Sequence, residues 1–502
     1  MASDRAFLEA AYKQLREVLS SRDDATLPSP SALQAASAAL PQTSDPDYLT
    51  RRGPDAAVTH ILDTVVPALN GQNLSGRYYG FVTGSALPVA EAADNVVSAL
   101  DQNVQVHLPA QTASTAVEDA ALRMLVDVLG LGPHDAWPGR TFTTGATASN
   151  VLGLACGREA VVASRLRKLG REGNASVGEA GLLAACQAAG VREIQVLTSM
   201  AHSSLSKAAS VVGLGRASVK EVGVSRDEPW RLDLGAIEKL LQREGVASII
   251  AVSAGEVNTG RFATKGEAEM RRLRTLADKY SAWVHVDGAF GIFARALPRS
   301  REFSRLHELT AGLELADSIT VDGHKLLNVP YDAGVFFCRD AFVQTNVFTN
   351  PNAAYLSSVG GSQIFSPLNI GLENSRRFRA LPVYATLVSE GRDGIAEMLA
   401  RMVIMARKIV EFIIHSDAYE LLPDETASLE EVHIVILFRA RDDAINDSLV
   451  QKINDTRKMY VSGTKWKGKS ACRIAVSSWK VQVENDLAVV KEVLTSIAGG
   501  RS

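Results

Sequence analysis

The chain has few of the features that mark disulfide-rich, nucleic-acid-binding or membrane proteins. Its 502 residues include only four cysteines, and no two of them have CxxC spacing. They are scattered in apolar runs, a placement typical of reduced core thiols in a cytosolic protein, although the sequence leaves disulfides open. The four are Cys156, Cys186, Cys338 and Cys472.

An excess of one charge and long apolar stretches are missing as well. A formal net charge of −3 gives no electrostatic attraction to nucleic acid, and the basic cluster at 165–171 is typical of a solvated helix end. No segment has the roughly twenty apolar residues of a membrane span. Residues 1–21 lack the apolar centre of a signal peptide. We therefore expect a cytoplasmic protein with no nucleic-acid or membrane partner.

The chain does have length and apolar content. With 46% hydrophobic residues over 502 positions, it can bury large cores and has room for two or three domains. Strand-like and helical runs alternate from about residue 94 to 339; a strand at 247–252, for example, precedes a helix at 267–280 and a strand at 283–287. Such alternation predicts an α/β fold with a mainly parallel sheet, helices on both faces and ligands at the carboxyl ends of the strands.

We divide the chain into three expected parts. Residues 1–93 form an N-terminal helical arm and linker, whose Pro/Ser/Ala-rich stretch from Pro28 to Pro46 is expected to be extended. Residues 94–380 form the large α/β domain. Residues 381–502 begin with a long helix and continue as a small α+β domain.

A lysine and an aspartate follow two of the strand-like runs. Lys325 comes just after the β-branched run 318–322, and Asp287 ends the alternating run that starts at Trp283. An imine-forming lysine must be partly desolvated so that its amine can be neutral. A strand-end carboxylate can keep a pyridine nitrogen protonated. Taken singly, such residues are commonly turn, cap or surface groups, but the pair is what pyridoxal 5'-phosphate (PLP) requires.

Two further segments have the pattern of a cofactor site. Residues 140–144 read as a strand and 145–150 open a helical run, so Ala146 and Thr147 are candidate phosphate contacts at a helix start. The alternative is an ordinary turn with Thr147 as its cap. His202 follows another strand and could lie flat on a cofactor ring, although a lone histidine at a helix start is more often a cap.

Together these motifs resemble the group II PLP-dependent amino-acid decarboxylases, the family of aromatic amino-acid, glutamate, histidine and diaminobutyrate decarboxylases. The resemblance implies the PLP-dependent transferase fold (fold type I) of the aspartate aminotransferase superfamily and a small-molecule amino-acid substrate. It runs from about Tyr78 to Trp479. The matching blocks are 80–84, 101–103, 144–150, 201–208, 285–289, 322–325 and 375–379.

The resemblance also implies roles for single residues. Lys325 would bond to the cofactor's aldehyde, Asp287 would pair with the pyridine nitrogen, and His202 would stack on the ring. The other implied cofactor contacts are Ala146, Thr147, Ala289, His324 and, from a partner subunit, Ser375.

A mobile loop about thirty residues after the lysine carries the family's proton-donating tyrosine, and here Tyr355 occupies that place. Its alternative is a tyrosine that packs the loop. Because the resemblance places this loop and Ser375 across a subunit interface, we expect a homodimer with composite active sites.

One departure leaves the reaction open. Where the family usually has paired threonines, the chain has Val257, which cannot donate a hydrogen bond. A carbon–carbon lyase of aldolase type or an aminotransferase therefore stays an alternative, as does a silent binding subunit. The substrate cannot be identified; Tyr79, Phe81 and His107 are candidates for an aromatic or mixed pocket wall, and equally for packing at a dimer interface.

Overall fold

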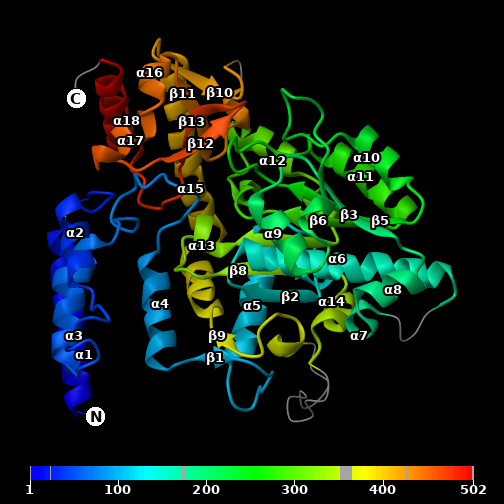
Figure 1. The fold of residues 1–502 in the computed structure, drawn as a ribbon, viewed down its shortest axis with the longest axis horizontal. Helices are drawn as coiled ribbons and strands as arrows, with labels where there is room; N and C mark the ends of the chain where they lie inside the picture. The colour runs from blue at the N-terminus through cyan, green and yellow to red at the C-terminus, as the bar shows by residue number, and fades with distance from the viewer. Residues whose placement is uncertain (1, 23, 172–175, 351–363, 426–427, 500–502) are drawn as a thin grey trace.

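The computed structural model describes residues 2–22, 24–171, 176–350, 364–425 and 428–499 (Figure 1). The chain begins with a group of helices at the left of Figure 1 and continues into a large α/β unit. It ends in a small α+β unit at the top. The N-terminal helices are α1 Ala2–Ser21, α2 Pro30–Ala39 and α3 Pro54–His60.

The expectation of an extended stretch from Pro28 to Pro46 is wrong, because α2 lies inside it. Ser29 caps this helix by accepting a hydrogen bond from the backbone N–H of Ala32, at 3.1 Å. Pro30 occupies the first helical position, where its fixed φ and missing N–H cost nothing. The proline and serine that suggested a linker are therefore start signals of a helix.

Within the described residues, seven strands form one sheet in the order β2-β8-β7-β6-β5-β3-β4. Strand β8 runs antiparallel to both of its neighbours, and the other pairings are parallel. This confirms the mainly parallel sheet. The strands are β2 Gly139–Thr143, β3 Glu193–Thr198, β4 Val219–Glu221, β5 Val246–Ser253, β6 Trp283–Asp287, β7 Ser318–Asp322 and β8 Gly334–Cys338.

Both faces of this sheet are buried, as alternation along β5 shows. Ile249 and Ala251 pack into one apolar cluster, whereas Ile250 and Val252 pack into another. Helices α6 and α9 contribute to the first cluster, and α5, α10, α11 and α15 to the second. The helices of this unit are α5 Ser114–Val128, α6 Ala146–Lys168, α7 Val177–Ala180, α8 Leu182–Ala188, α9 Ser203–Val211, α10 Leu234–Leu241, α11 Glu267–Tyr280, α12 Ser304–Thr310, α13 Gly323–Leu326, α14 Ala341–Phe348 and α15 Ala380–Ile414.

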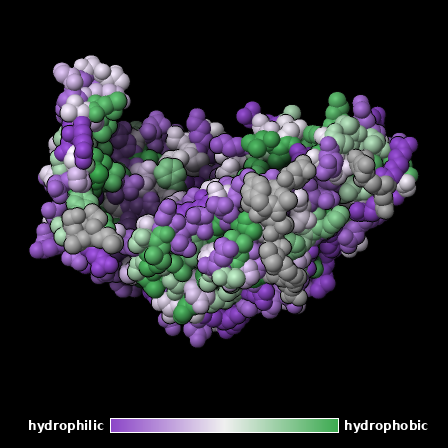
Figure 2. All heavy atoms as spheres, turned by 90° about the horizontal axis from the view of Figure 1, so that it is seen from below, coloured by the Kyte–Doolittle hydropathy of each residue, from purple (hydrophilic) through white to green (hydrophobic). Residues whose placement is uncertain are grey.

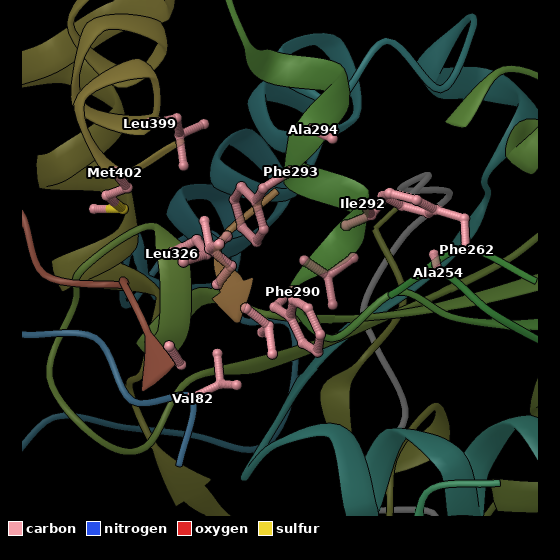
Figure 3. Packing of buried hydrophobic residues seen from close by; sticks show 14 of the residues in the cluster. Val82, Ala254, Phe262, Phe290, Ile292, Phe293, Ala294, Leu326, Leu399 and Met402 are labelled. Atoms are coloured by element: carbon pink, nitrogen blue, oxygen red, sulfur yellow. The ribbon is translucent and has the colours of Figure 1, made fainter. Parts of the chain in front are cut away.

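The second cluster anchors the short helix that carries Lys325. Figure 3 shows Leu326 of α13 in the same cluster as Phe290, Phe293, Leu399 and Met402, and all five side chains are buried. Because α13 is a single turn, burial of Leu326 directs the neighbouring position toward the end of the sheet. The core thus holds the lysine's backbone in place.

The small C-terminal unit contains, in its described residues, a four-stranded antiparallel sheet of order β10-β11-β13-β12. The apolar pattern at 473–478 predicts a strand, and its first residues lie in β13, whereas the sequence gives no sign of β12. The sequence also predicts one helix near 444–459, where the structure has two short helices. The elements are β10 Tyr419–Leu422, β11 Val435–Ala440, β12 Ser462–Trp466, β13 Lys469–Ala475, α16 Asp443–Asn446, α17 Leu449–Asp455 and α18 Val483–Ala498.

Two helices lie at the expected domain boundaries. Helix α4 Pro88–Ala99 spans position 93, and α15 begins at Ala380. Strands β1 Asn103–Val104 and β9 Arg376–Arg377 pair antiparallel beside the large sheet. The three-part division remains a prediction. Among the described helices, none is long and apolar enough to cross a membrane.

Candidate active site

A cavity of about 560 Å³ lies at the carboxyl ends of the parallel strands. Its wall comes from the residues that end or follow β2, β3, β5, β6 and β7, with additions from residues 81–83 and from β13. The predicted ligand edge of the sheet is therefore where the cavity is. Of the predicted site residues, the cavity brings together Ala146, His202, Asp287, Ala289 and Lys325.

Lys325 reaches the cavity from the turn that follows β7. Its side chain is 19% exposed, and its Nζ lies 2.8 Å from Oδ2 of Asp322, which is almost fully buried. The other carboxylate oxygen of Asp322 has no hydrogen-bond partner within the described residues. The lysine is thus partly desolvated and held at one oxygen.

Asp287 ends β6, the strand beside β7, and is half-buried. Its Oδ2 accepts a hydrogen bond from the side-chain amide of Asn150 at 2.9 Å, and its Oδ1 accepts one from the backbone N–H of Ala289 at 3.3 Å. Two donors from different parts of the chain fix the orientation of this carboxyl group. The cavity therefore has an anchored carboxylate in its wall.

His202 lines the same cavity as the N-cap of α9. Its Nδ1 accepts the backbone N–H of Ser204 at 3.2 Å and lies 2.6 Å from the Ser204 hydroxyl. Partial burial lowers the pKa of His202 below the ordinary histidine value. The ring is uncharged at neutral pH, with its proton on Nε2.

The start of α6 faces the cavity through Ala146. Its N-cap is Gly145, whose φ of 146° favours glycine and which has no side chain to cap the first N–H groups. A Cβ at Gly145 would lie 3.1 Å from Cε1 of His324, a tight approach that glycine avoids. His324 is itself oriented, because its Nδ1 accepts the backbone N–H of Ala333 at 3.1 Å. Burial lowers the pKa of His324.

Four predicted site residues do not join this cavity within the described chain. Thr147 and Ser375 are exposed, and His324 is buried behind the turn; none of these three contributes to the wall. Tyr355 lies outside the described residues. Their roles remain predictions.

The structure adds residues that the sequence reasoning missed. Arg473 of β13 lines the cavity although it is almost fully buried; its Nη1 donates to the carbonyl of Val257 at 2.9 Å, and its Nε has no partner within the described residues. Burial lowers the pKa of Arg473. Tyr331 also lines the cavity and stacks on His324, with 4.0 Å between the ring centroids. No motif marked either residue.

The predicted aromatic pocket wall is correct for one of its three residues. Phe81 lines the cavity, as does Val257. Tyr79 is instead fully buried in the apolar core. His107 is buried, with its Nδ1 2.8 Å from the Thr115 hydroxyl, and does not line the cavity.

The chain is similar to several known proteins. The pyridoxal-dependent decarboxylase conserved domain matches residues 81–441. L-2,4-Diaminobutyrate decarboxylase of Acinetobacter baumannii is 26% identical over 423 residues, or 81% of this chain and 77% of that protein. Tryptophan decarboxylase 1 of Oryza sativa subsp. japonica is 25% identical over 446 residues, or 84% and 80%.

The fold is also found among solved structures. The crystal structure of Oryza sativa TDC with PLP and tryptamine matches this chain with a TM-score of 0.80 at 22% identity, covering 100% of this chain and 98% of that one. This likeness confirms the expected fold type I.

The residues of the cavity fit pyridoxal 5'-phosphate. The uncapped start of α6 at Gly145 suits a phosphate, and the anchored carboxylate of Asp287 suits a protonated pyridine nitrogen. An aldehyde requires an amine to bond to, and Lys325 is the only lysine among the described residues that line the cavity. Phosphate, ring and aldehyde thus each have a chemically matched group on a different strand end.

Proposed function

We propose which side chains carry the reaction, from the premise that the chain belongs to the pyridoxal-dependent decarboxylase family. It is an enzyme that uses pyridoxal 5'-phosphate to decarboxylate an amino acid. The observation that supports our assignment is the convergence of Lys325, Asp287, His202 and the start of α6 on one cavity.

When bound, pyridoxal 5'-phosphate acts as an electron sink that takes up the electrons left on the α-carbon as carbon dioxide departs. We assign Asp287 to hold the proton at the pyridine nitrogen, since its carboxylate is already oriented by two donors. Lys325 holds the aldehyde, and Asp322 holds the lysine's ammonium group when the amine is free. The uncharged His202, which lines the cavity, would hold the ring by stacking on it.

The phosphate is assigned to the start of α6, at Ala146 and Thr147, with His324 donating from Nε2 and Ser375 reaching in from the partner subunit. The support is the uncapped helix end and the hydrogen bond that leaves the proton of His324 on Nε2. Ala289 keeps the ring's edge free of bulk beside Asp287.

Arg473 is assigned to the substrate. Arg473 is the only arginine among the described residues that line the cavity. Its Nε has no hydrogen-bond partner within the described residues. A buried donor of this kind binds an acceptor group of a ligand strongly. Replacing Arg473 with Gln, which keeps an amide donor but removes the charge, is expected to raise KM more than it lowers kcat.

Tyr355 is assigned as the acid that returns a proton to the α-carbon, as the family resemblance implies. Tyr331 offers a matched control, because it is a tyrosine that lines the same cavity. Tyr355→Phe should slow amine formation more than carbon dioxide release, whereas Tyr331→Phe should change both equally. The reverse pattern would transfer the role to Tyr331.

The active unit is proposed to be a homodimer with composite sites. Apolar side chains on α1 and α2 are exposed, among them Leu8, Tyr12 and Leu33, as is Leu40 just after α2. Figure 2 shows apolar atoms along the inner side of a projection at the left, where Figure 1 places these helices, beside a hollow. Such a surface suits a second copy of the chain. We also propose a cytoplasmic location, supported by four cysteines that are all free thiols.

Two experiments test these assignments. The purified protein, loaded with cofactor, is incubated with pooled L-amino acids while carbon dioxide, amine, aldehyde and keto acid are measured. Carbon dioxide with amine supports the assignment; keto acid or aldol products without carbon dioxide would contradict it. Mixing inactive Lys325→Ala and Tyr355→Phe subunits should restore activity through hybrid sites, and a fully active monomer would exclude composite sites.

A further inference from the structure

We infer that Asn150 is a positioning residue that orients the Asp287 carboxylate. A chain of buried hydrogen bonds runs from Trp283 through Asn150 to Asp287, and a branch from Asn150 leads to His202. This inference deepens the proposed function and rests on the role assigned there to Asp287. Asn150 does not line the cavity, so it acts only through other residues.

The side-chain amide of Asn150 is fully buried on the first turns of α6 and uses all of its hydrogen-bonding groups. Its Nδ2 donates to Asp287 Oδ2 at 2.9 Å and to Ser204 Oγ at 3.1 Å. Its Oδ1 lies 2.9 Å from His285 Nε2 and accepts the Thr320 hydroxyl at 3.2 Å. Four satisfied bonds leave the amide one orientation.

That orientation gives the chain of bonds a direction. Because Asn150 presents its oxygen to His285, the His285 proton must be on Nε2, and Nδ1 then accepts the hydroxyl proton of Ser318 at 2.8 Å. The Ser318 oxygen in turn accepts the indole N–H of Trp283 at 2.9 Å. Each group donates to the next, and the last acceptor is the Asp287 carboxylate.

The direction is fixed at the start of the chain, because the indole N–H of Trp283 can only donate. Burial lowers the pKa of His285 to about 4, so the ring stays neutral with one donor and one acceptor nitrogen. A helix glycine makes room for this ring, since a Cβ at Gly153 would lie 2.4 Å from His285 Cε1. The missing side chain at Gly153 therefore lets the His285 ring pack directly against the backbone of α6.

The second amide hydrogen of Asn150 reaches His202. Since the Ser204 oxygen accepts it, the Ser204 hydroxyl is free to donate to His202 Nδ1, 2.6 Å away. His202 then accepts two hydrogens on Nδ1 and cannot be protonated there. One amide thus contacts both the Asp287 carboxyl group and the serine that donates to His202, the two groups that would hold the cofactor ring.

The test measures how strongly the protein distinguishes pyridoxal 5'-phosphate from its 1-deaza analogue, in which carbon replaces the pyridine nitrogen. Both compounds have the same phosphate and aldehyde, so the ratio of their dissociation constants isolates the contact with Asp287. For the wild type we expect the dissociation constant of the deaza analogue to exceed that of pyridoxal 5'-phosphate by a factor of about ten or more. Asn150→Leu and the isosteric Asn150→Asp should both bring the ratio close to one. Ser204→Ala, which removes the His202 branch only, should leave it within about threefold of the wild type.

The outcomes separate this inference from the proposed function. If Asp287→Asn abolishes the ratio but the Asn150 variants weaken both ligands equally, Asn150 is merely structural and the inference fails. If the wild type itself does not distinguish the two compounds, the role of Asp287 fails and the inference fails with it. Thermal unfolding checks that each variant is folded, and Asn150→Asp retains the shape of the side chain should Asn150→Leu not fold.

Discussion

Strands β6 and β7 are neighbours in the sheet, and each ends in an aspartate at the same edge, yet the two carboxylates have opposite surroundings. Asp287 is half-buried and accepts hydrogen bonds on both oxygens, from Asn150 and from the backbone of Ala289. Asp322 is almost fully buried, contacts Lys325 through one oxygen and leaves the other without a described partner.

The difference teaches that a strand-end carboxylate takes its role from its donors and not from its place in the fold. Fixed neutral donors hold the Asp287 carboxyl group in position. Among the described residues, Asp322 pairs with the Lys325 ammonium group at 2.8 Å and faces His324 Nε2 at 3.7 Å, so its environment changes when the lysine bonds elsewhere. Asp287 therefore suits a ligand group that needs an acceptor in a fixed position. Asp322 suits a lysine that is free only when no ligand is bonded to it.

The largest effect should come from removing the cation that distinguishes the two sites. Lys325→Ala is expected to lower activity at least about 10³-fold, because no other lysine of the described wall can hold the aldehyde. Borohydride treatment followed by peptide mass analysis should find a reduced adduct on Lys325 in the wild type and none in the variant. An adduct on another lysine in the wild type would refute the assignment.

Asp287→Asn should have the next largest effect on activity. The amide keeps the shape of the side chain but cannot stabilise a positive charge on the pyridine nitrogen, so amine formation should fall about 10²- to 10³-fold with cofactor still bound. The rate is measured at saturating cofactor, with bound cofactor quantified by its absorbance. Near-wild-type turnover would remove Asp287 from its role.

The hydrogen-bond network behind Asp287 should make the stability of the protein depend on pH through His285. Since burial lowers the pKa of His285 to about 4 from an ordinary 6.5, the unfolded chain binds more protons between these values. The contribution of His285 to the free energy of unfolding is fully present above about pH 6.5. It is lost as the pH falls toward 4, and it amounts to roughly 3 kcal/mol. Denaturant unfolding against pH should therefore be flatter for His285→Gln.

His433→Gln is the matched control for that experiment. Burial also lowers the pKa of His433, to about 3, but its ring lies outside the hydrogen-bond chain to Asp287. It should flatten the same stability profile without changing the preference for pyridoxal 5'-phosphate over its deaza analogue. A change in that preference would show that the effect is not specific to the network.

The smallest effect, and the sharpest contrast, concerns stability with and without cofactor. Asp322→Asn should destabilise the cofactor-free protein by about 1–3 kcal/mol more than the loaded one, because the lysine ammonium loses its partner only when it is free. Asp287→Asn should do the reverse, since its charge is needed only when the pyridine nitrogen is present. Unfolding both variants in both forms measures the four values. If each variant lost the same unfolding free energy with and without cofactor, Asp287 and Asp322 would not differ in the way proposed.

Much of the framework was predictable because it depends on local pattern. Alternating or continuous apolar runs predicted β5, β6 and β7, and the helix expected at 267–280 is α11. Edge strand β12 was missed because its residues Ser462 to Trp466 are mostly polar, as one exposed edge allows. The linker prediction failed because Pro30 can begin a helix as well as prevent one.

The sequence by itself determined which chemical groups follow which strands, because strand and helix periods are local and parallel strands bring their carboxyl ends to one edge. Lys325 and Asp287 were found in this way. Only the tertiary structure decided their surroundings: Asn150 meets Asp287 across 137 positions, and Arg473 reaches the cavity from the last sheet of the chain. Charge state and orientation depend on such distant donors and on burial, and neither is encoded in the spacing of neighbouring residues.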